Sequence, residues 1–203
     1  MNPPLLYIEG VAVMGGAFAK LSEMQTHTRF VSVYDLGPDL FDGVQGVLVP
    51  AHIDQRALQK HQPLLQRHLD NGGRLVLNGH MVHLCLAWLK PFVPLPERNQ
   101  VGLQITRLAD HPVFDGVDPR DLTYRRGVAG FYGRGHNPMP DGARPIHGIG
   151  PEQHPLDWEL PLHSGGRVLM HSGNDLWMYA ADATSARRIA PQLVNWLKEG
   201  VTA

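Results

Sequence analysis

The sequence predicts an α/β protein built around a mostly parallel sheet with helices on both faces. Within residues 1–90, short apolar runs alternate with segments of helical periodicity, the order expected of strands and crossover helices in a parallel sheet. The apolar runs are nearly continuous, as in strands that are buried on both faces. Hydrophobic residues make up 43% of the 203 residues and charged residues 18%, so a folded core is expected. No linker or internal repeat stands out, and a single domain over residues 1–203 is predicted.

The strands of the first 90 residues are predicted from these apolar runs. The third run is centred on Val47, Leu48 and Val49, and Pro50 fits the end of that strand because proline cannot donate to a sheet ladder. The predicted strands lie within residues 5–13, 28–36, 41–53 and 74–79.

The helices are predicted from apolar periodicity and end signals. In residues 54–73, Leu58, Leu65 and Leu69 fall on one face, with Asp54 as N-cap and Gly72 as C-cap. The predicted helices are 15–24, 54–73, 80–90 and the amphipathic segment 185–200, whose shared face carries Ile189, Leu193, Trp196 and Leu197.

Residues 91–165 are predicted as a loop-rich excursion. The chain has 22 glycines and 17 prolines, and many of them lie after residue 91. We expect one strand and a tight turn in residues 101–117, a hairpin or excursion in 121–150, and a strand running into a loop in 165–179.

Composition excludes several functional classes. The net charge is −1 without a basic block, so nucleic-acid binding is not expected. A single cysteine excludes an intrachain disulfide and fits a reducing compartment. The first residues resemble neither a signal peptide nor a membrane span, and a cytoplasmic location without membrane contact is expected.

Five segments in this order resemble the class I glutamine amidotransferase-like fold, and most closely its trehalose-utilisation-like (ThuA-like) branch. They are "FDGVQGVLVPAH", "LLQRHLDNGGRLVLNGH", "DHPVFDGV", "GGRVLMHSGND" and the final "LVNWL". The resemblance implies a flavodoxin-like, doubly wound sheet, a site at the carboxyl ends of the strands and, often, homo-oligomers. It does not fix a reaction, since one fold hosts many functions.

The amidotransferase nucleophile is missing at its expected place. The resemblance implies a comparison with true amidotransferases, which carry a cysteine at the turn after the fourth predicted strand; this chain has Gly79 or His80 there. Cys85 lies further along the predicted helix 80–90 among apolar neighbours, so we expect it to be buried and inert. At the other strand end, the family's His-x-Glu pair is replaced by His171 and Asp175 at a different spacing. Glutaminase activity is therefore not expected.

Other chemistry at the strand ends stays open. His80, His52 and Asp175 are the candidate catalytic residues, because a histidine beside a carboxylate serves as a general base near neutral pH. The candidate ligand-binding residues are Glu9, Gly10, Gly79, His136, Asn174 and Trp177. The alternative is that the histidines only bond to loop backbone.

Three further patterns in the sequence concern metal and ligand binding. The spacing of His80 and His83 suits a metal only if a third ligand arrives, and no metal or cofactor is predicted. A carboxylate and an amide beside Trp177 suit a polyol or sugar-like ligand, although Asp175 would equally form a structural turn. The glycine-rich segment 125–138 would bind an anion through its arginines, or pack on a second subunit through Phe131 and Tyr132.

Two hypotheses follow. The first is an amidotransferase-like domain without glutaminase activity that binds a small ligand or a partner protein. The second is a hydrolase or isomerase that acts on a carbohydrate-like substrate with a His/Asp site at the strand ends. Whether the chain is an enzyme is left open by the sequence.

Overall fold

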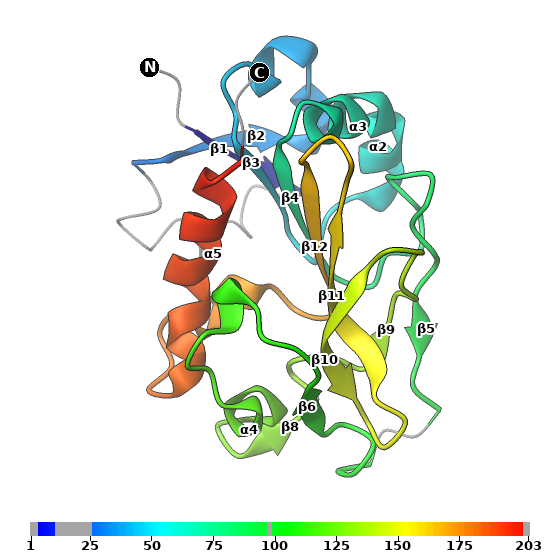
Figure 1. Cartoon of the computed structure of the whole chain (residues 1–203), viewed down its shortest axis with the longest axis vertical. Coiled ribbons are helices and arrows are strands. Elements are labelled where there is room, and N and C mark those ends of the chain that lie inside the picture. The colour runs from blue at the N-terminus through cyan, green and yellow to red at the C-terminus, as the bar shows by residue number, and fades with distance from the viewer. Residues whose placement is uncertain (1–3, 11–25, 97–98, 201–203) are drawn as a thin grey trace.

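Eight strands form one sheet in the order β2-β1-β3-β4-β12-β11-β10-β6 (Figure 1). The computed structural model describes residues 4–10, 26–96 and 99–200. The first five strands in this order run parallel, and the last three extend the sheet in antiparallel fashion. The parallel strands are β2 (Thr28–Ser32), β1 (Leu5–Glu9), β3 (Gly46–Val49), β4 (Arg74–Asn78) and β12 (Arg167–His171); the antiparallel ones are β11 (His154–Pro161), β10 (Arg144–Ile149) and β6 (Ile105–Arg107).

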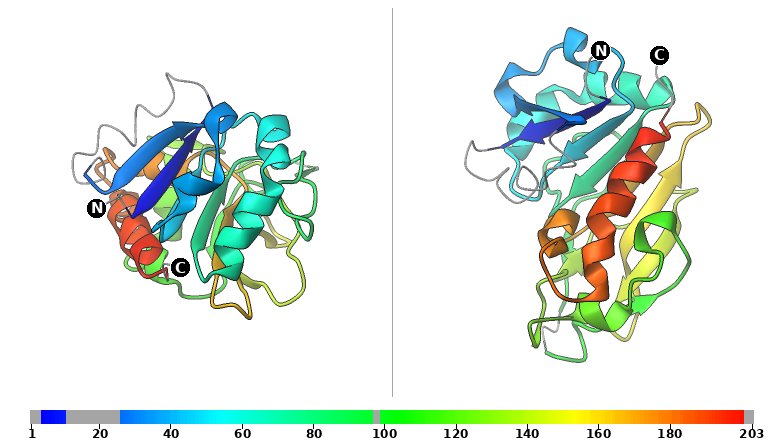
Figure 2. Two further views of the ribbon diagram at one scale, coloured as in Figure 1. Left: turned by 90° about the horizontal axis from the view of Figure 1, so that it is seen from above. Right: turned by 90° about the vertical axis from the view of Figure 1, so that its left-hand side faces the viewer.

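Helices cover both faces of the sheet, which confirms the predicted fold class. Because side chains alternate along a strand, Leu6 and Ile8 face one side and Leu5 and Tyr7 the other. The first side packs against α2 (Gln55–Lys60) and α3 (Gln62–Asp70), and the second against α5 (Ile189–Lys198). The view from above in Figure 2 shows α5 and α3 on opposite sides of the strands.

The segment predicted as one helix over 54–73 forms two. Asp54 is the N-cap, and its side chain accepts hydrogen bonds from the backbone N–H groups of Arg56 and Ala57. Pro63 lies in the first turn of α3, where its missing N–H is tolerated. The chain therefore bends at His61, which ends α2 and caps α3.

The predicted helix over residues 80–90 is wrong, because these residues form no helix. Two side chains take the backbone groups that a helix would use. Gln55 accepts hydrogen bonds from the N–H groups of Val82 and His83, and Asn137 donates to the carbonyl oxygens of Met81 and Lys90. The loop still buries its apolar side chains, which are Met81, Cys85, Leu86 and Leu89.

The segment predicted to be loop-rich, residues 91–165, supplies three strands of the main sheet. It also forms two short ribbons, β5 (Val93–Pro94) with β9 (Gly135–His136) and β7 (Tyr124–Arg125) with β8 (Val128–Ala129). In the chain between β5 and β7 lie the 3₁₀ turn η3 (Pro112–Phe114) and the short helix α4 (Pro119–Thr123).

Other boundaries differ slightly from the predictions. The strand predicted over 28–36 ends at Ser32 and passes into the 3₁₀ turns η1 (Val33–Asp35) and η2 (Pro38–Phe41). The strand predicted over 165–179 is β12 followed by the 3₁₀ turn η4 (Leu176–Tyr179), and the last predicted helix is the 3₁₀ turn η5 (Ser185–Arg188) continued by α5. The predicted helix 15–24 lies outside the described residues. Within the described part of the chain, no helix is long and apolar enough to cross a membrane.

Candidate functional site

The carboxyl ends of β1, β3, β4 and β12 meet at one edge of the sheet. A Cβ atom built on Gly10 would lie 2.5 Å from the carbonyl oxygen of His52. The backbone N–H of Ala51 donates a hydrogen bond of 2.6 Å to Asp175 Oδ1. The structure therefore brings the predicted residues Gly10, His52 and Asp175 into one neighbourhood, with Glu9 directly before Gly10 in the chain.

The turn after β4 has no room for a side chain. Gly79 has a φ angle of +103°, and a Cβ atom there would lie 2.8 Å from both Cα and the carbonyl oxygen of Ala51. Its N–H donates to the carbonyl oxygen of His171, which ties β4 to the end of β12. Only glycine fits such a contact with a positive φ. Position 79 is thus structural and cannot hold a nucleophile.

The buried environment of Cys85 makes its thiol a poor nucleophile. Its side chain is fully buried among the apolar residues that pack below α2 and α3. Burial raises the pKa of the thiol to about 12, because the thiolate would lose its hydration. A thiol with this pKa is almost entirely protonated at neutral pH, as the sequence predicted for an inert cysteine.

A shallow pocket of about 290 Å³ lies over the strand ends. We call it the strand-end pocket. His80 and Arg134 are exposed there, and Asn174 is half-buried. The amide of Asn174 donates to the carbonyl oxygen of Phe131, which fixes the glycine-rich loop against the end of β12. The lining residues are His80, Gly130, Phe131, Gly133, Arg134, Gly173 and Asn174.

Two of the three candidate catalytic residues lie beside this pocket rather than in its lining. Asp175 is half-buried, and burial raises its pKa, against the opposing effects of the Ala51 N–H and of His52. His52 itself is exposed. His80 lines the pocket, and its ring stacks on Phe92 with the ring centroids 3.9 Å apart. The three residues share one edge of the sheet without forming a hydrogen-bonded triad in the described structure.

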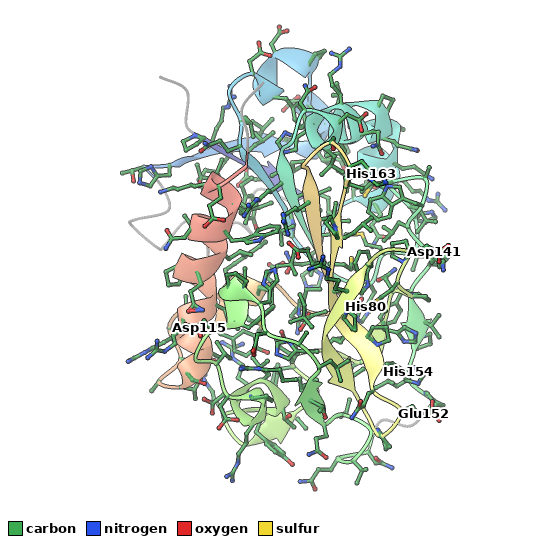
Figure 3. All side chains as sticks on the ribbon, in the orientation of Figure 1. His80, Asp115, Asp141, Glu152, His154 and His163 are labelled. Carbon is green, nitrogen blue, oxygen red and sulfur yellow. The ribbon has the colours of Figure 1, made fainter. Side chains whose placement is uncertain are left out.

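Two predicted ligand-binding residues, Trp177 and His136, do not line the strand-end pocket. Trp177 is only 1% exposed and packs edge-on against Tyr7 in the core, so it offers no face to a sugar. His136 stacks on His154 at 4.7 Å, and Nε2 of His154 contacts Glu152 at 2.8 Å. Figure 3 labels His80 near the middle of the molecule and His154 with Glu152 at the lower right. Neither residue belongs to the lining of the strand-end pocket.

The side chain of His83 lies beside an arginine. His83 Nε2 lies 3.3 Å from Nε of Arg56, so His83 faces a guanidinium rather than a second ligand. Among the described residues, no group of three or more His, Cys, Asp or Glu side chains is arranged to hold a metal ion.

Sequence reasoning missed a buried polar network on the α5 side of the sheet. Asp157 on β11 is fully buried and accepts three hydrogen bonds: from Tyr132 Oη at 2.6 Å, His147 Nδ1 at 2.7 Å and His171 Nδ1 at 2.5 Å. Burial alone would raise the pKa of Asp157, but the two histidines hold it well below its usual range. In the sequence, the segment "LDWEL" shows only the alternating pattern of a strand with two acidic residues, and nothing in it indicates the partners of Asp157.

His171 links this network to the strand ends. It is the last residue of β12, and its carbonyl oxygen accepts from Gly79. Its Nε2 atom is buried and has no hydrogen-bond partner within the described structure. A Cβ atom on Gly173, which lines the strand-end pocket, would lie 2.6 Å from this Nε2 atom. The imidazole thus lies directly beneath the pocket lining.

Comparison with known proteins supports the fold. No protein-family model and no curated protein matches the chain. Solved structures match over nearly its whole length. PurLQS from Thermotoga maritima aligns with a TM-score of 0.60 at 11% identity, covering 97% of this chain and 100% of that one. A glutamine amidotransferase from the same organism gives 0.51 at 9%, covering 98% and 94%.

The matching structures also include a protein of the ThuA-like branch, which the sequence resembles. A putative ThuA-like protein from Bacteroides uniformis aligns with a TM-score of 0.51 at 10% identity, covering 95% of this chain and 89% of that one. At such identities the likeness concerns the fold, and it confirms the flavodoxin-like, doubly wound sheet. The chain therefore has the class I glutamine amidotransferase-like fold, shared with ThuA-like proteins.

Proposed function

We propose that this chain is an amidotransferase-like domain without glutaminase activity that binds a small polar ligand in the strand-end pocket. The observation that carries this proposal is the turn at Gly79. A cysteine cannot occupy that position, because its Cβ atom would overlap the Ala51 backbone. Cys85, with a pKa of about 12, does not replace it.

The pocket lining indicates the chemistry of the ligand. Arg134 uses Nε for the carbonyl oxygen of Gly130, which holds the guanidinium at the pocket edge. His80 and Asn174 add polar atoms, and Phe131 is 40% exposed. A polyol or sugar-like molecule, with several hydroxyl groups and one apolar face, suits these groups. With Trp177 in the core, Phe131 is the ring available for stacking.

The absence of glutaminase activity is tested by ammonia release from glutamine. We expect no release above the rate of a Cys85→Ser variant, in which the side chain nearly keeps its size but has no thiol. Ammonia release that the Cys85→Ser variant abolishes would contradict the proposal directly.

Ligand binding is tested by titrating a panel of sugars and polyols into the protein, followed by calorimetry. Arg134→Gln and His80→Ala are expected to weaken any binding by about tenfold, the effect of losing a charged or polar anchor. Arg120→Gln is the matched control, since Arg120 is an exposed arginine on α4 outside the pocket lining. Equal loss in the control, or no loss in the pocket variants, would place the ligand elsewhere.

A hydrolase or isomerase acting on a carbohydrate-like substrate is the second candidate. It is favoured by Asp175, whose raised pKa and proximity to His52 suit proton transfer. Asp175→Asn keeps an oxygen for the Ala51 N–H, so it separates chemistry from folding. If the wild-type protein converts a sugar, as followed by NMR, this variant should lose the conversion. Conversion that Asp175→Asn leaves intact would refute this role.

Partner binding and self-association belong to the same proposal. The resemblance implied a homo-oligomer, and Phe131 together with Val128, which is 54% exposed, offers an apolar surface on the glycine-rich segment. Light scattering after size-exclusion chromatography measures the oligomeric state. A wild-type dimer that becomes monomeric in Val128→Asp would support this surface, and a monomeric wild type would remove it.

A further inference from the structure

A second cavity, of about 330 Å³, lies near the amino ends of the parallel strands, at the other end of the strands from the strand-end pocket. It lies between η2, the following turn at residues 42–44 and α3, and we call it the helix-side cavity. In Figure 1 the blue turns of η1 and η2 lie beside α3 at the top of the molecule. Its volume falls in the range of about 300–1,000 Å³ that ligand pockets occupy. Phe41, Val44 and Leu64 give it an apolar floor.

A buried histidine, His68, is among the residues that line this cavity. His68 is 5% exposed, and its Nε2 atom lies 3.1 Å from the carbonyl oxygen of Arg74. A carbonyl oxygen only accepts, so Nε2 carries the hydrogen. Burial lowers the pKa of His68, which keeps the ring neutral at neutral pH and leaves Nδ1 as an acceptor. His68 therefore suits a ligand that donates a hydrogen bond.

Opposite charges line the cavity without pairing with each other. Asp39 and Asp42 lie on the η2 side, and Arg67 lies on α3. Within the described part of the chain, Arg67 forms no ion pair with either carboxylate. The carboxyl end of α3, with its partial negative charge, adds to the acidic side. A ligand that carries both charges would satisfy both walls.

We propose that the helix-side cavity binds a small zwitterion of the amino-acid class with an aliphatic side chain. The ammonium group would meet Asp39, Asp42 and the acceptor nitrogen of His68. The carboxylate would bind Arg67, because a guanidinium group can donate two parallel hydrogen bonds to one carboxylate. The aliphatic side chain would lie on the apolar floor. This site is separate from the strand-end pocket and does not depend on the function proposed there.

The test uses three compounds with the same aliphatic chain. L-leucine carries both charged groups, isopentylamine only the ammonium group, and 4-methylpentanoate only the carboxylate. Each is titrated into the full chain, labelled with nitrogen-15, and amide shifts are followed by NMR. We expect L-leucine to shift residues 38–44 and 64–71 in a saturable way, and both single-charge compounds to bind at least about tenfold more weakly. No saturable shift with L-leucine, or shifts confined to the strand-end pocket, would overturn the proposal.

Variants assign the two walls. Arg67→Gln should weaken L-leucine by at least about tenfold and leave isopentylamine unchanged, while Asp42→Asn should weaken both. Both residues are exposed, so the fold is retained. Arg120→Gln again serves as the control and should bind L-leucine like the wild type. Equal binding of isopentylamine and L-leucine by the wild type would show that the carboxylate is not recognised and would overturn the zwitterion assignment.

Discussion

Replacing Asp157 with asparagine is the sharpest test of the buried network. The carboxylate accepts hydrogen bonds from Tyr132, His147 and His171 with no exposure to solvent. Asparagine has one acceptor oxygen, so its amide N–H₂ must face one of these three donors. A hydrogen bond to a charged group contributes about 1.5–3 kcal/mol. Because one of the three bonds is lost, we expect Asp157→Asn to lower the free energy of unfolding by about 1.5–3 kcal/mol.

The assay is urea unfolding followed by circular dichroism and tryptophan fluorescence. Asp141→Asn is the matched control, because Asp141 is exposed (Figure 3) and a surface substitution changes stability by less than about 0.5 kcal/mol. A loss below about 1 kcal/mol in Asp157→Asn would refute the reasoning, since it would mean that the three hydrogen bonds do not stabilise the fold.

Three further predictions concern single positions. Gly79→Ala should lower the free energy of unfolding by more than about 2 kcal/mol, because it adds a clash with Ala51 to the strain of a positive φ. Gly127→Ala is the control, since Gly127 has a φ of +80° with open space around it and should show the strain alone. Equal losses of stability in the two variants would contradict the clash at Gly79. Burial raises the pKa of Glu159, but the hydrogen bond from Arg167 and the imidazole of His111, whose Nε2 lies 3.7 Å from the carboxylate, together hold it at about 2. The contribution of Glu159 to stability is therefore fully present above the unfolded pKa of 4.5 and is lost as pH falls toward 2. Unfolding curves of the wild type should therefore lose about 3 kcal/mol more between neutral pH and about pH 2 than those of Glu159→Gln, and an equal acid dependence would count against it. Cys85 should resist iodoacetamide in the folded protein and react fully in denaturant, as intact mass would show; rapid labelling of the folded chain would contradict its burial.

The parallel half of the fold was predictable because its signals are local. Leu75, Val76 and Leu77 form a continuous apolar run, and Asp54 carries an N-cap signal that the structure uses. Residues 80–90 misled the prediction, since the spacing of Met81, Cys85 and Leu89 is helical. What removes the helix is a pair of distant side chains, Gln55 and Asn137, and no local pattern reveals hydrogen bonds across such separations.

The candidate site was predictable only as an edge of the sheet. The predicted ends of the strands placed His52 and Asp175 at the carboxyl edge of the sheet, and the structure places them there too. The roles of single side chains depended on packing: Trp177 turned inward against Tyr7, and His136 turned to His154. The network around Asp157 joins the loop residue Tyr132 with His147, Asp157 and His171 of three strands, so it emerges only once the sheet is assembled.

The place of β12 in the sheet has a consequence for how the chain is made. β12 lies between β4 and β11, and it pairs Arg167 with Arg74, 93 residues earlier (167 − 74). As the chain leaves the ribosome, the first four parallel strands and the β10–β11 hairpin are complete before the strand that joins them exists. Until then each presents an unpaired edge, which invites association with other chains. Productive folding of this protein thus waits for its last strand, and slowed synthesis before residue 167 should increase aggregation.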